Sequence, residues 1–338
     1  MQPSKCLSIG IAVNTLTGFS SVTSSVNAAS LFVGSFNNDS VLRYDAATGE
    51  YLETFISNSD GELDGPVALT VGPDNDFYIA SILTDSILRY DGRTGAFLGT
   101  FVSSGSGGLD VPQDLTFGPD GNLYVSGANP FTSNSVLRYD GQTGEFIDAF
   151  VTPGSGEILA PFGVRFGLDG NLYVSGTLSS NILRYNGQTG ELIDVFATVT
   201  PGALPGGLTF GVDNNLYVAN FGSNNIERYD GITGELIDIF VNNATGELDG
   251  PVHPVFGPDG NLYVSSLRTS AVLRYDGQTG NLIDEFIPTG TGGLDGAGWL
   301  VFREDLTPVT ETASTGATLA IANLELTSWL SQKQQNKG

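Results

Sequence analysis

Four residues with chemically distinctive side chains interrupt an otherwise repetitive sequence: Asp114, Arg165, His253 and Trp299. His253 is the only histidine in the 338-residue chain, and a proline follows it. A carboxylate, an imidazole and an indole can bind a metal, a glycan or a lactone when a fold collects them in one place. Gln113 adds a polar group beside Asp114. Whether these side chains form one site depends on the elements that carry them.

Those elements belong to a repeat. An Arg-Tyr pair recurs at spacings of 46, 49, 46, 44 and 46 residues, with its arginine at Arg43, Arg89, Arg138, Arg184, Arg228 and Arg274. Between the pairs, short runs of alternating apolar and polar residues are separated by turn signals such as Asp-Gly, a pattern typical of β-strands. One unit predicts strands at 112–118, 123–127, 135–140 and 145–151. Four antiparallel strands in a repeat of about 45 residues predict one blade of a β-propeller.

The two ends of the repeat are complementary. The pattern begins at 31–36 with a second strand and ends at 297–302 with a first strand. We therefore predict an all-β, six-bladed β-propeller over 29–305, with four antiparallel strands per blade. Three N-terminal strands and one C-terminal strand would share the closing blade. Such closure removes the open sheet edges that a linear array would leave.

The innermost strands of the six blades differ at one aligned position. That position holds Ala68, Asp114, Gly163, Gly207, His253 and Trp299. Drift at a packing position usually stays apolar, whereas this set includes an acid, a histidine and an indole. The crossovers and the loops after the second strands share one face of a propeller, and here that face varies most. We predict a binding site there, at the mouth of the central channel. Its residues are Asp114, Arg165, His253, Trp299 and Gln113. The long loop at 127–135 is a second candidate.

Other repeated residues have a structural interpretation. Aromatic residues end most of the first strands and are expected to wedge between blades, at Phe117, Phe166, Phe210, Phe256 and Phe302, with Val71 in blade two. Each third-strand arginine should pair with the residue ten positions later, as in Arg43–Glu53, Arg138–Asp148, Arg184–Asp194, Arg228–Asp238 and Arg274–Asp284. Arg89 breaks this rule because it meets Gly99. Opposite charges facing each other across a hairpin favour a structural role for these arginines.

The repeat resembles the NHL-type six-bladed propellers, of the exported bacterial kind that is frequent in cyanobacteria. The residues that carry the resemblance are Pro205-Gly206-Gly207-Leu208, Asp213-Asn214-Asn215, Leu216-Tyr217-Val218 and Arg228-Tyr229-Asp230. The resemblance covers about residues 31–305 and implies the propeller fold. It does not imply one activity, because this fold carries lyases, lactonases, RNA-binding proteins and scaffolds.

Two functions remain open at this point. The first is a non-catalytic binding or scaffold protein that uses the variable face for a protein or glycan partner. The alternative is a divalent-metal-dependent lyase or lactonase. The resemblance implies several histidines, or a Glu, Asn and Asp set, around the metal of such enzymes, whereas Asp114 and His253 are the only titratable groups at the aligned position. No cofactor is firmly implied, although Asp and Asn loops could bind Ca²⁺ through oxygen ligands. Oligomeric state is not predicted.

Composition limits the partners and suggests export. A net charge of −24 argues against nucleic acid and anionic membranes as partners. Residues 1–28 read as a signal peptide, with Lys5 before a short apolar run, so we expect a secreted, periplasmic or cell-surface protein. No transmembrane span is expected. Residues 306–338 form a linker, a mildly apolar run and a basic end, which resembles a degenerate PEP-CTERM sorting signal, with 309–315 in place of its motif.

Overall fold

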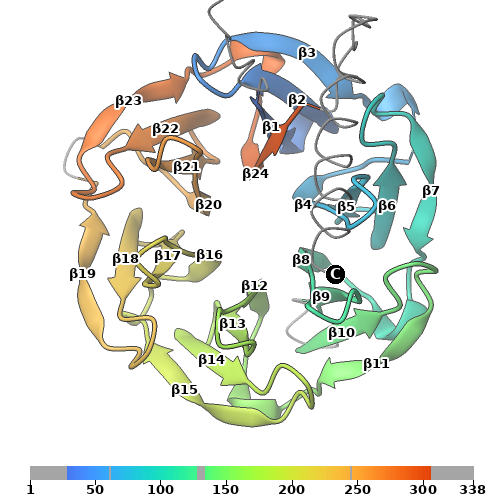
Figure 1. Ribbon diagram of the computed structural model, residues 1–338, viewed down its shortest axis with the longest axis vertical. Coiled ribbons are helices and arrows are strands. Elements are labelled where there is room, and N and C mark those ends of the chain that lie inside the picture. Colours follow the sequence, from blue (N-terminus) through green and yellow to red (C-terminus); the bar gives the residue numbers. More distant parts are fainter. Residues whose placement is uncertain (1–28, 61, 128–133, 244–245, 306–338) are drawn as a thin grey trace, which may run out of the picture.

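Six four-stranded antiparallel sheets surround a central axis in the computed structural model (Figure 1). The structure describes residues 29–60, 62–127, 134–243 and 246–305. The predicted six-bladed β-propeller is confirmed, with 24 strands. Within the described residues the only helical segments are three-residue 3-10 turns, η1 to η5, and no helix there has the length and hydropathy to span a membrane. The expected signal peptide (1–28), tail (306–338) and most of the 127–135 loop lie outside the described residues.

The strands follow one order in every blade, from the channel outward. Blade one holds β24 (Ala297–Glu304), β1 (Ala29–Ser35), β2 (Ser40–Asp45) and β3 (Tyr51–Ile56). Blade two holds β4 (Pro66–Val71), β5 (Phe77–Ser81), β6 (Ser86–Tyr90) and β7 (Phe97–Val102). Blade three holds β8 (Pro112–Phe117), β9 (Leu123–Gly127), β10 (Ser135–Tyr139) and β11 (Phe146–Val151).

The remaining blades repeat this order. Blade four holds β12 (Pro161–Phe166), β13 (Leu172–Gly176), β14 (Asn181–Tyr185) and β15 (Leu192–Thr198). Blade five holds β16 (Pro205–Phe210), β17 (Leu216–Asn220), β18 (Asn225–Tyr229) and β19 (Leu236–Val241). Blade six holds β20 (Pro251–Phe256), β21 (Leu262–Ser266), β22 (Ala271–Tyr275) and β23 (Leu282–Ile287).

The ring closes as the sequence predicts. The C-terminal strand β24 pairs antiparallel with β1, so three N-terminal strands and one C-terminal strand share blade one. Ala29 faces Glu304 across this pair, and Leu31 faces Phe302. The pairing gives blade one the same four strands as the other blades, with an innermost edge strand facing the channel.

Aromatic side chains pack the interfaces between blades. Each second-strand tyrosine meets the phenylalanine that ends the next blade's first strand, with ring centroids 4.8–5.0 Å apart: Tyr78–Phe117, Tyr124–Phe166, Tyr173–Phe210, Tyr217–Phe256 and Tyr263–Phe302. The predicted wedges are therefore confirmed, and their edge-to-face geometry suits aromatic quadrupoles. The interface between blades one and two differs, because Val71 is small. There the Arg303 guanidinium lies 4.8 Å from the Phe32 ring centroid and 4.6 Å from that of Phe77.

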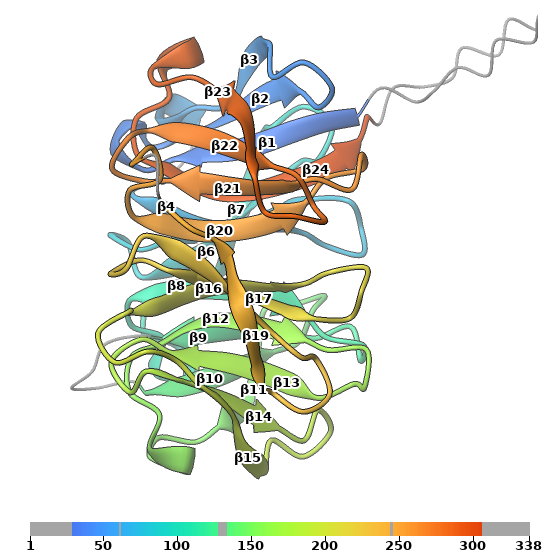
Figure 2. The same ribbon diagram turned by 90° about the vertical axis from the view of Figure 1, so that its left-hand side faces the viewer.

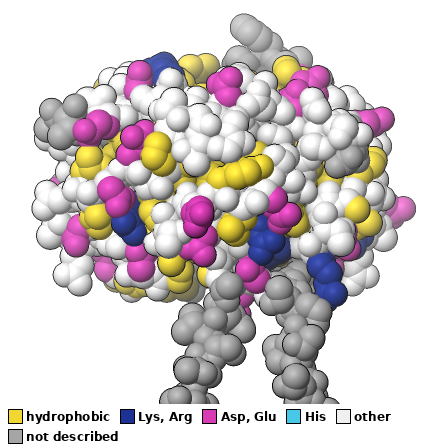
Figure 3. Space-filling view, turned by 90° about the horizontal axis from the view of Figure 1, so that it is seen from above, with side chains coloured by type: hydrophobic (Ala, Val, Ile, Leu, Met, Phe, Trp, Pro, Cys, Tyr) yellow, Lys and Arg dark blue, Asp and Glu magenta, His cyan; other side chains and the backbone are white. Residues whose placement is uncertain are grey.

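Ion pairs line the outer rim as predicted. Arginines on third strands contact acids on fourth strands in five blades, through Arg43–Glu53, Arg138–Asp148, Arg184–Asp194, Arg228–Asp238 and Arg274–Asp284. In blade two Arg89 faces Gly99 and binds Asp74 and Asp76 instead. The outer strands turn steeply relative to the inner ones (Figure 2), as sheet twist requires. Apolar side chains are interspersed with acidic ones on this outer surface (Figure 3).

The two faces of the ring are built from different connections. On one face, the residue after the second strand donates its N–H to a crossover carbonyl in blades one, two, four, five and six: Phe36 to Gly296, Ile82 to Gly65, Thr177 to Ala160, Phe221 to Leu204 and Leu267 to Gly250. The opposite face carries the repeated Asp-Gly-type and Gly-x-Thr-Gly-type turns. Ala29 and Glu304 also lie at that opposite face, because β24 runs away from its crossover. The variable loops therefore lie on the side opposite Ala29 and Glu304.

Candidate functional site

A β-bulge near the start of each first strand determines which side chains reach the channel. The pairing of β12 with β13 shifts between Pro161 and Val164, and the other five blades shift at the equivalent place. A bulge places two consecutive residues opposite one partner, so simple alternation fails there. Each blade therefore contributes two consecutive residues to the channel, and together the six blades form two adjacent rings of residues. The upper ring is Val67, Gln113, Phe162, Gly206, Val252 and Gly298, and the lower ring is the aligned set that contains Asp114, His253 and Trp299.

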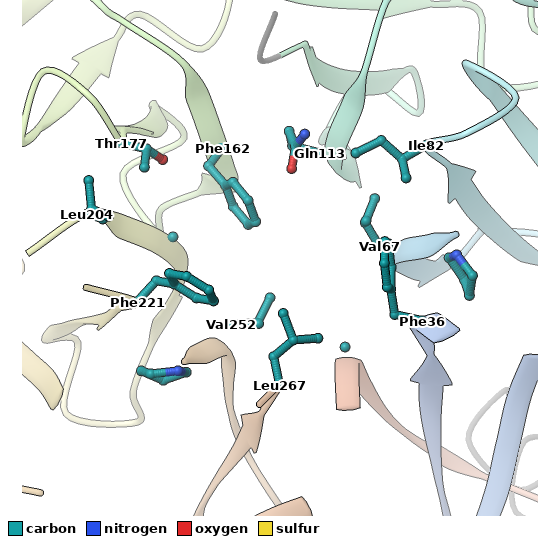
Figure 4. Close-up of a pocket in the computed structure, with 14 residues that line it drawn as sticks. Phe36, Val67, Ile82, Gln113, Phe162, Thr177, Leu204, Phe221, Val252 and Leu267 are labelled. Carbon is teal, nitrogen blue, oxygen red and sulfur yellow. The ribbon is translucent and has the colours of Figure 1, made fainter. Parts of the chain in front are cut away.

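The upper ring opens into an apolar cup on the variable face (Figure 4). The cup has a volume of about 280 Å³. Its walls are the residues that follow the second strands, namely Phe36, Ile82, Thr177, Phe221 and Leu267, and its base includes Val67, Gln113, Phe162, Gly206, Val252 and Gly298. Leu204, Pro66 and Pro251 complete the lining. Phe162 and Phe221 turn their rings into the cavity. Apart from Gln113 and Thr177, every lining residue in the part of the chain that the structure describes is apolar or is a glycine.

The cup walls are held by the hydrogen bonds between loop and crossover. Ile82 N–H binds the Gly65 carbonyl and the next residue, Leu83, binds the Asp64 carbonyl. The same pair of bonds recurs at Leu267 and Arg268, which bind Gly250 and Asp249. Each wall residue is thus fixed by backbone bonds that do not depend on its side chain, so its identity can vary without loss of the scaffold.

A buried polar layer lies beside the cup, and it contains four of the predicted site residues. Asp114 is fully buried and accepts hydrogen bonds from Leu115 N–H (2.7 Å), Val164 N–H (2.9 Å) and Arg165 Nη1 (3.0 Å). Arg165 also donates to the Val164 carbonyl and places Nη2 2.8 Å from His253 Nε2. The layer therefore joins blades three, four and six.

His253 and Trp299 complete this layer. Their rings stack with centroids 4.6 Å apart and an interplanar angle of 16°. Trp299 also lies 5.7 Å from the Phe162 ring of blade four, on the other side of the channel. Leu300 N–H donates to His253 Nδ1 at 3.3 Å. Trp299 is fully buried and its Nε1 has no hydrogen-bond partner among the described residues.

The layer perturbs its own titratable groups. Burial raises the pKa of Asp114, while the Arg165 guanidinium and the N–H groups of Val164 and Leu115 oppose that rise. Burial, and then the charge of Arg165, hold the pKa of His253 well below 6.5. Both imidazole nitrogens face N–H groups, so a second proton on the ring would find no acceptor. His253 is consequently neutral at physiological pH.

The structure brings the predicted site residues together but divides them between two environments. Gln113 alone lines the cup. Asp114, His253 and Trp299 are at most 4% exposed, and Arg165 does not belong to the lining. That these four bind a ligand stays a prediction. Sequence reasoning missed Phe36, Ile82, Phe221 and Leu267. Their signal was an apolar residue at the start of a loop, where a turn residue is expected.

The acids and the histidine do not form a recognisable metal site. Within the described residues, no group of three or more His, Cys, Asp or Glu side chains is arranged to hold a metal ion. Around His253 the nearest charged group is the Arg165 guanidinium, which would repel a cation. The donor chemistry of this layer therefore does not suit a divalent metal.

Comparison with known proteins identifies the fold. No protein-family model and no curated protein matches the sequence. A chain from a nidogen–laminin complex is 17% identical, with a TM-score of 0.64 over 81% of this chain and 98% of that one. A Bacteroides caccae protein of unknown function is 13% identical, with a TM-score of 0.60 over 81% and 98%. A streptogramin B lyase is 20% identical, with a TM-score of 0.52 over 70% and 72%. These similarities show a shared propeller fold.

Proposed function

We propose that this protein is a non-catalytic binding propeller whose apolar cup holds an apolar group of a protein partner. The observation that carries the proposal is the cup itself. It lies on the variable face and has aromatic walls, and among the described residues only Gln113 and Thr177 contribute polar side chains to it. A cavity of about 280 Å³ lies just below the usual size of small-molecule pockets, about 300–1,000 Å³, and suits one or two inserted side chains.

The cup chemistry favours a protein partner over a glycan. A glycan presents many hydroxyl groups, and burying them without hydrogen bonds costs free energy. A leucine or tryptophan side chain loses no such bonds and gains about 25 cal/mol for each Å² of apolar surface removed from water. The nidogen–laminin complex contains a propeller of this fold, which is compatible with a protein partner.

The enzymatic alternative has less support. A metal-dependent lyase or lactonase would need exposed oxygen or nitrogen ligands in the cavity, whereas His253 and Asp114 are buried beside it and engaged with Arg165. The streptogramin B lyase resemblance concerns the fold. Two proposals from the sequence are retained. The protein is exported, and its repeat is related to the NHL-type propellers of exported bacterial proteins. These proposals rest on residues 1–28, the repeat and residues 306–338.

A neutral peptide tests the proposal directly. Ligand-observed NMR should detect binding of an acetylated, amidated peptide with a central Trp-Leu pair flanked by glycine. Val252→Asp places a carboxylate in the cup and should abolish that binding. Ile237→Asp makes the same chemical change on the outer rim, where Ile237 is 47% exposed, and should leave binding unchanged. Equal binding by parent and Val252→Asp, with both folded by circular dichroism, would refute the proposal.

A further inference from the structure

The shoulder around the cup is divided into two arcs. In each blade it consists of the crossover residue that lies two positions before the first residue of the innermost strand. It also includes the loop residue whose backbone N–H binds the carbonyl of that crossover residue, as Leu83 binds Asp64. Four consecutive blades, six, one, two and three, place an acid there: Asp249, Asp295, Asp64 and Asp110. Blades four and five place Leu159 and Ala203 instead. Leu159 and its bonded neighbour Leu178 are 45% and 55% exposed, so the second arc extends the apolar surface.

The acidic arc contains few opposing charges. Among the described residues, Arg268 is the only cation on the shoulder, and its Nη1 lies 2.9 Å from Asp249 Oδ1. Asp64 and Asp295 are exposed. Two further carboxylates lie close by, because Asp39 accepts Gly65 N–H at 2.7 Å and Asp85 accepts Val111 N–H at 2.9 Å. The negative potential is therefore concentrated on one side of an apolar cavity.

Arg268 shows how a cation sits on this shoulder. Its guanidinium lies 4.4 Å above the Phe221 ring, which is a cup wall, while it pairs with Asp249. The equivalent three places around blade two hold Phe36, Asp64 and Leu83. A Cβ on Gly65 would lie near Phe36 and Leu83, as one on Gly250 would lie near Phe221 and Arg268. Blade two thus has the ring and the carboxylate, without an arginine.

We propose that the cup binds a segment of another protein in which an apolar side chain is flanked by lysine or arginine. The apolar side chain enters the cup, and a basic neighbour lies over Phe36 and pairs with Asp64, as Arg268 does with Phe221 and Asp249. A cation is attracted by an aromatic face and by a carboxylate, and both are present at one place. The Leu159–Leu178 arc receives the apolar remainder of the segment. This inference rests on the proposed function of the cup.

Three peptides with the same central Trp-Leu pair, flanked by lysine, glycine or glutamate, test the charge preference on the full chain. At low salt the lysine peptide should bind at least about tenfold tighter than the glutamate peptide. The difference should shrink in 1 M salt, where the screening length falls to about 3 Å. Equal affinities of the lysine and glutamate peptides would overturn the inference. If the glycine peptide does not bind, the proposed function of the cup is contradicted, whatever the two charged peptides do.

Two opposite substitutions test where the lysine of the peptide binds. Leu83→Arg supplies an internal cation to Phe36 and Asp64 and should weaken the lysine peptide about three- to tenfold, with the glycine peptide unchanged. Arg268→Leu removes the internal cation at Phe221 and should strengthen the lysine peptide by a similar factor. Ile237→Arg is the matched control, because it adds the same charge on the rim. If Ile237→Arg acts as strongly as Leu83→Arg, only the net charge of the protein matters and the assigned place is wrong.

The chain itself contains one segment of similar chemistry. Residues 327–338 include Trp329 and Leu330 followed by Lys333 and Lys337. A free peptide of this sequence should bind more weakly than the lysine-flanked Trp-Leu peptide, since its lysines lie further from the apolar pair. If it binds more tightly, the occupant is the tail of a second copy, and the assignment to another protein is overturned.

Discussion

Two arginine–aspartate pairs in this molecule have similar contacts and different surroundings. On the rim, Arg184 meets Asp194 through two bonds, Nε–Oδ1 at 3.1 Å and Nη2–Oδ2 at 2.5 Å, and the Asp194 side chain is 41% exposed. In the channel, Arg165 meets Asp114 at 3.0 Å, and Asp114 is not exposed at all. The rim pair has equivalents in four other blades, whereas the channel pair occurs once.

The difference shows that burial and additional partners, rather than the ion pair itself, determine what each pair contributes. Water solvates Asp194 if Arg184 is removed. Asp114 has no exposed surface, and it also accepts hydrogen bonds from the N–H groups of Leu115 and Val164. A half-exposed pair contributes a median of about 0–1 kcal/mol, whereas breaking a buried pair costs about 3–5 kcal/mol. Four changes, ordered by expected effect, test this contrast between channel and rim.

Deletion of residues 297–305 should have the largest effect. It removes β24, the innermost strand of blade one, and with it Trp299 and Leu300. The exposed edge of β1 and the lost channel layer should abolish cooperative unfolding or lower the melting temperature strongly. Deletion of 306–338 alone is the control and should leave the melting temperature close to that of the parent. If the first truncation melts like the parent, ring closure contributes nothing to stability.

Asp114→Ala should lower the free energy of unfolding by about 3–5 kcal/mol, because it leaves the Arg165 charge and two N–H groups without their acceptor. Urea denaturation followed by circular dichroism measures the loss. Asp114→Asn keeps one acceptor oxygen and should cost less. A loss below about 1 kcal/mol for the alanine variant would make the channel pair energetically equivalent to a rim pair.

Acid should destabilise the channel through His253. Its pKa in the folded protein is well below 6.5, so below pH 6.5 the unfolded chain binds a proton that the folded chain does not. Stability conferred by the neutral histidine is therefore present above pH 6.5 and is lost as the pH falls.

His253→Gln isolates the contribution of the histidine, because the carboxylates titrate in both proteins and their effect cancels in the comparison. Between pH 7 and pH 5 the free energy of unfolding should fall more for the parent than for the variant, because only the parent has a histidine whose protonation favours the unfolded chain. A constant difference from pH 7 to pH 5 would mean that His253 titrates in the folded protein as it does in the unfolded chain, and that the channel does not favour its neutral form.

Arg184→Ala should have the smallest effect, below about 1 kcal/mol in the free energy of unfolding, since Asp194 stays partly solvated. The arginine also lies 5.2 Å from the Phe196 ring centroid, and this contact is lost as well. A measured loss of several kcal/mol would place the rim pairs in the same class as the channel pair and would end the contrast.

The fold could be predicted from the sequence because repetition presents each strand several times. The Arg43–Glu53 offset of ten residues recurs in four other blades, and each occurrence supports the same hairpin register. The complementary strands at 31–36 and 297–302 then require closure, which the β1–β24 pair confirms. The positions that recur in every repeat are those that pack within and between the blades, so the repeat in the sequence reveals the fold.

The site could be predicted only in part. His253, Asp114 and Trp299 were recognisable because a repeat unit has no packing reason to vary so widely at one position. The cup was not, because the bulge after Pro161 places Phe162 and Gly163 side by side and shifts the mouth by one residue. Nor can strand alternation indicate that Phe36 and Phe221, which lie outside the strands, turn towards a common axis.

Because Ala29 pairs with Glu304, the two ends of the propeller are adjacent, and the same ring could be built from a chain that begins in another blade. Facing residues on antiparallel strands have Cα atoms about 4.5–5.5 Å apart, so a short glycine-serine linker could join these two. New ends could then be opened in the exposed turn at 119–122, on the face away from the cup. In such a circular permutant, β24, β1, β2 and β3 would follow one another in sequence, as the strands of the other five blades now do. The cup, which draws residues from all the blades, would be built from the same side chains in a rearranged gene.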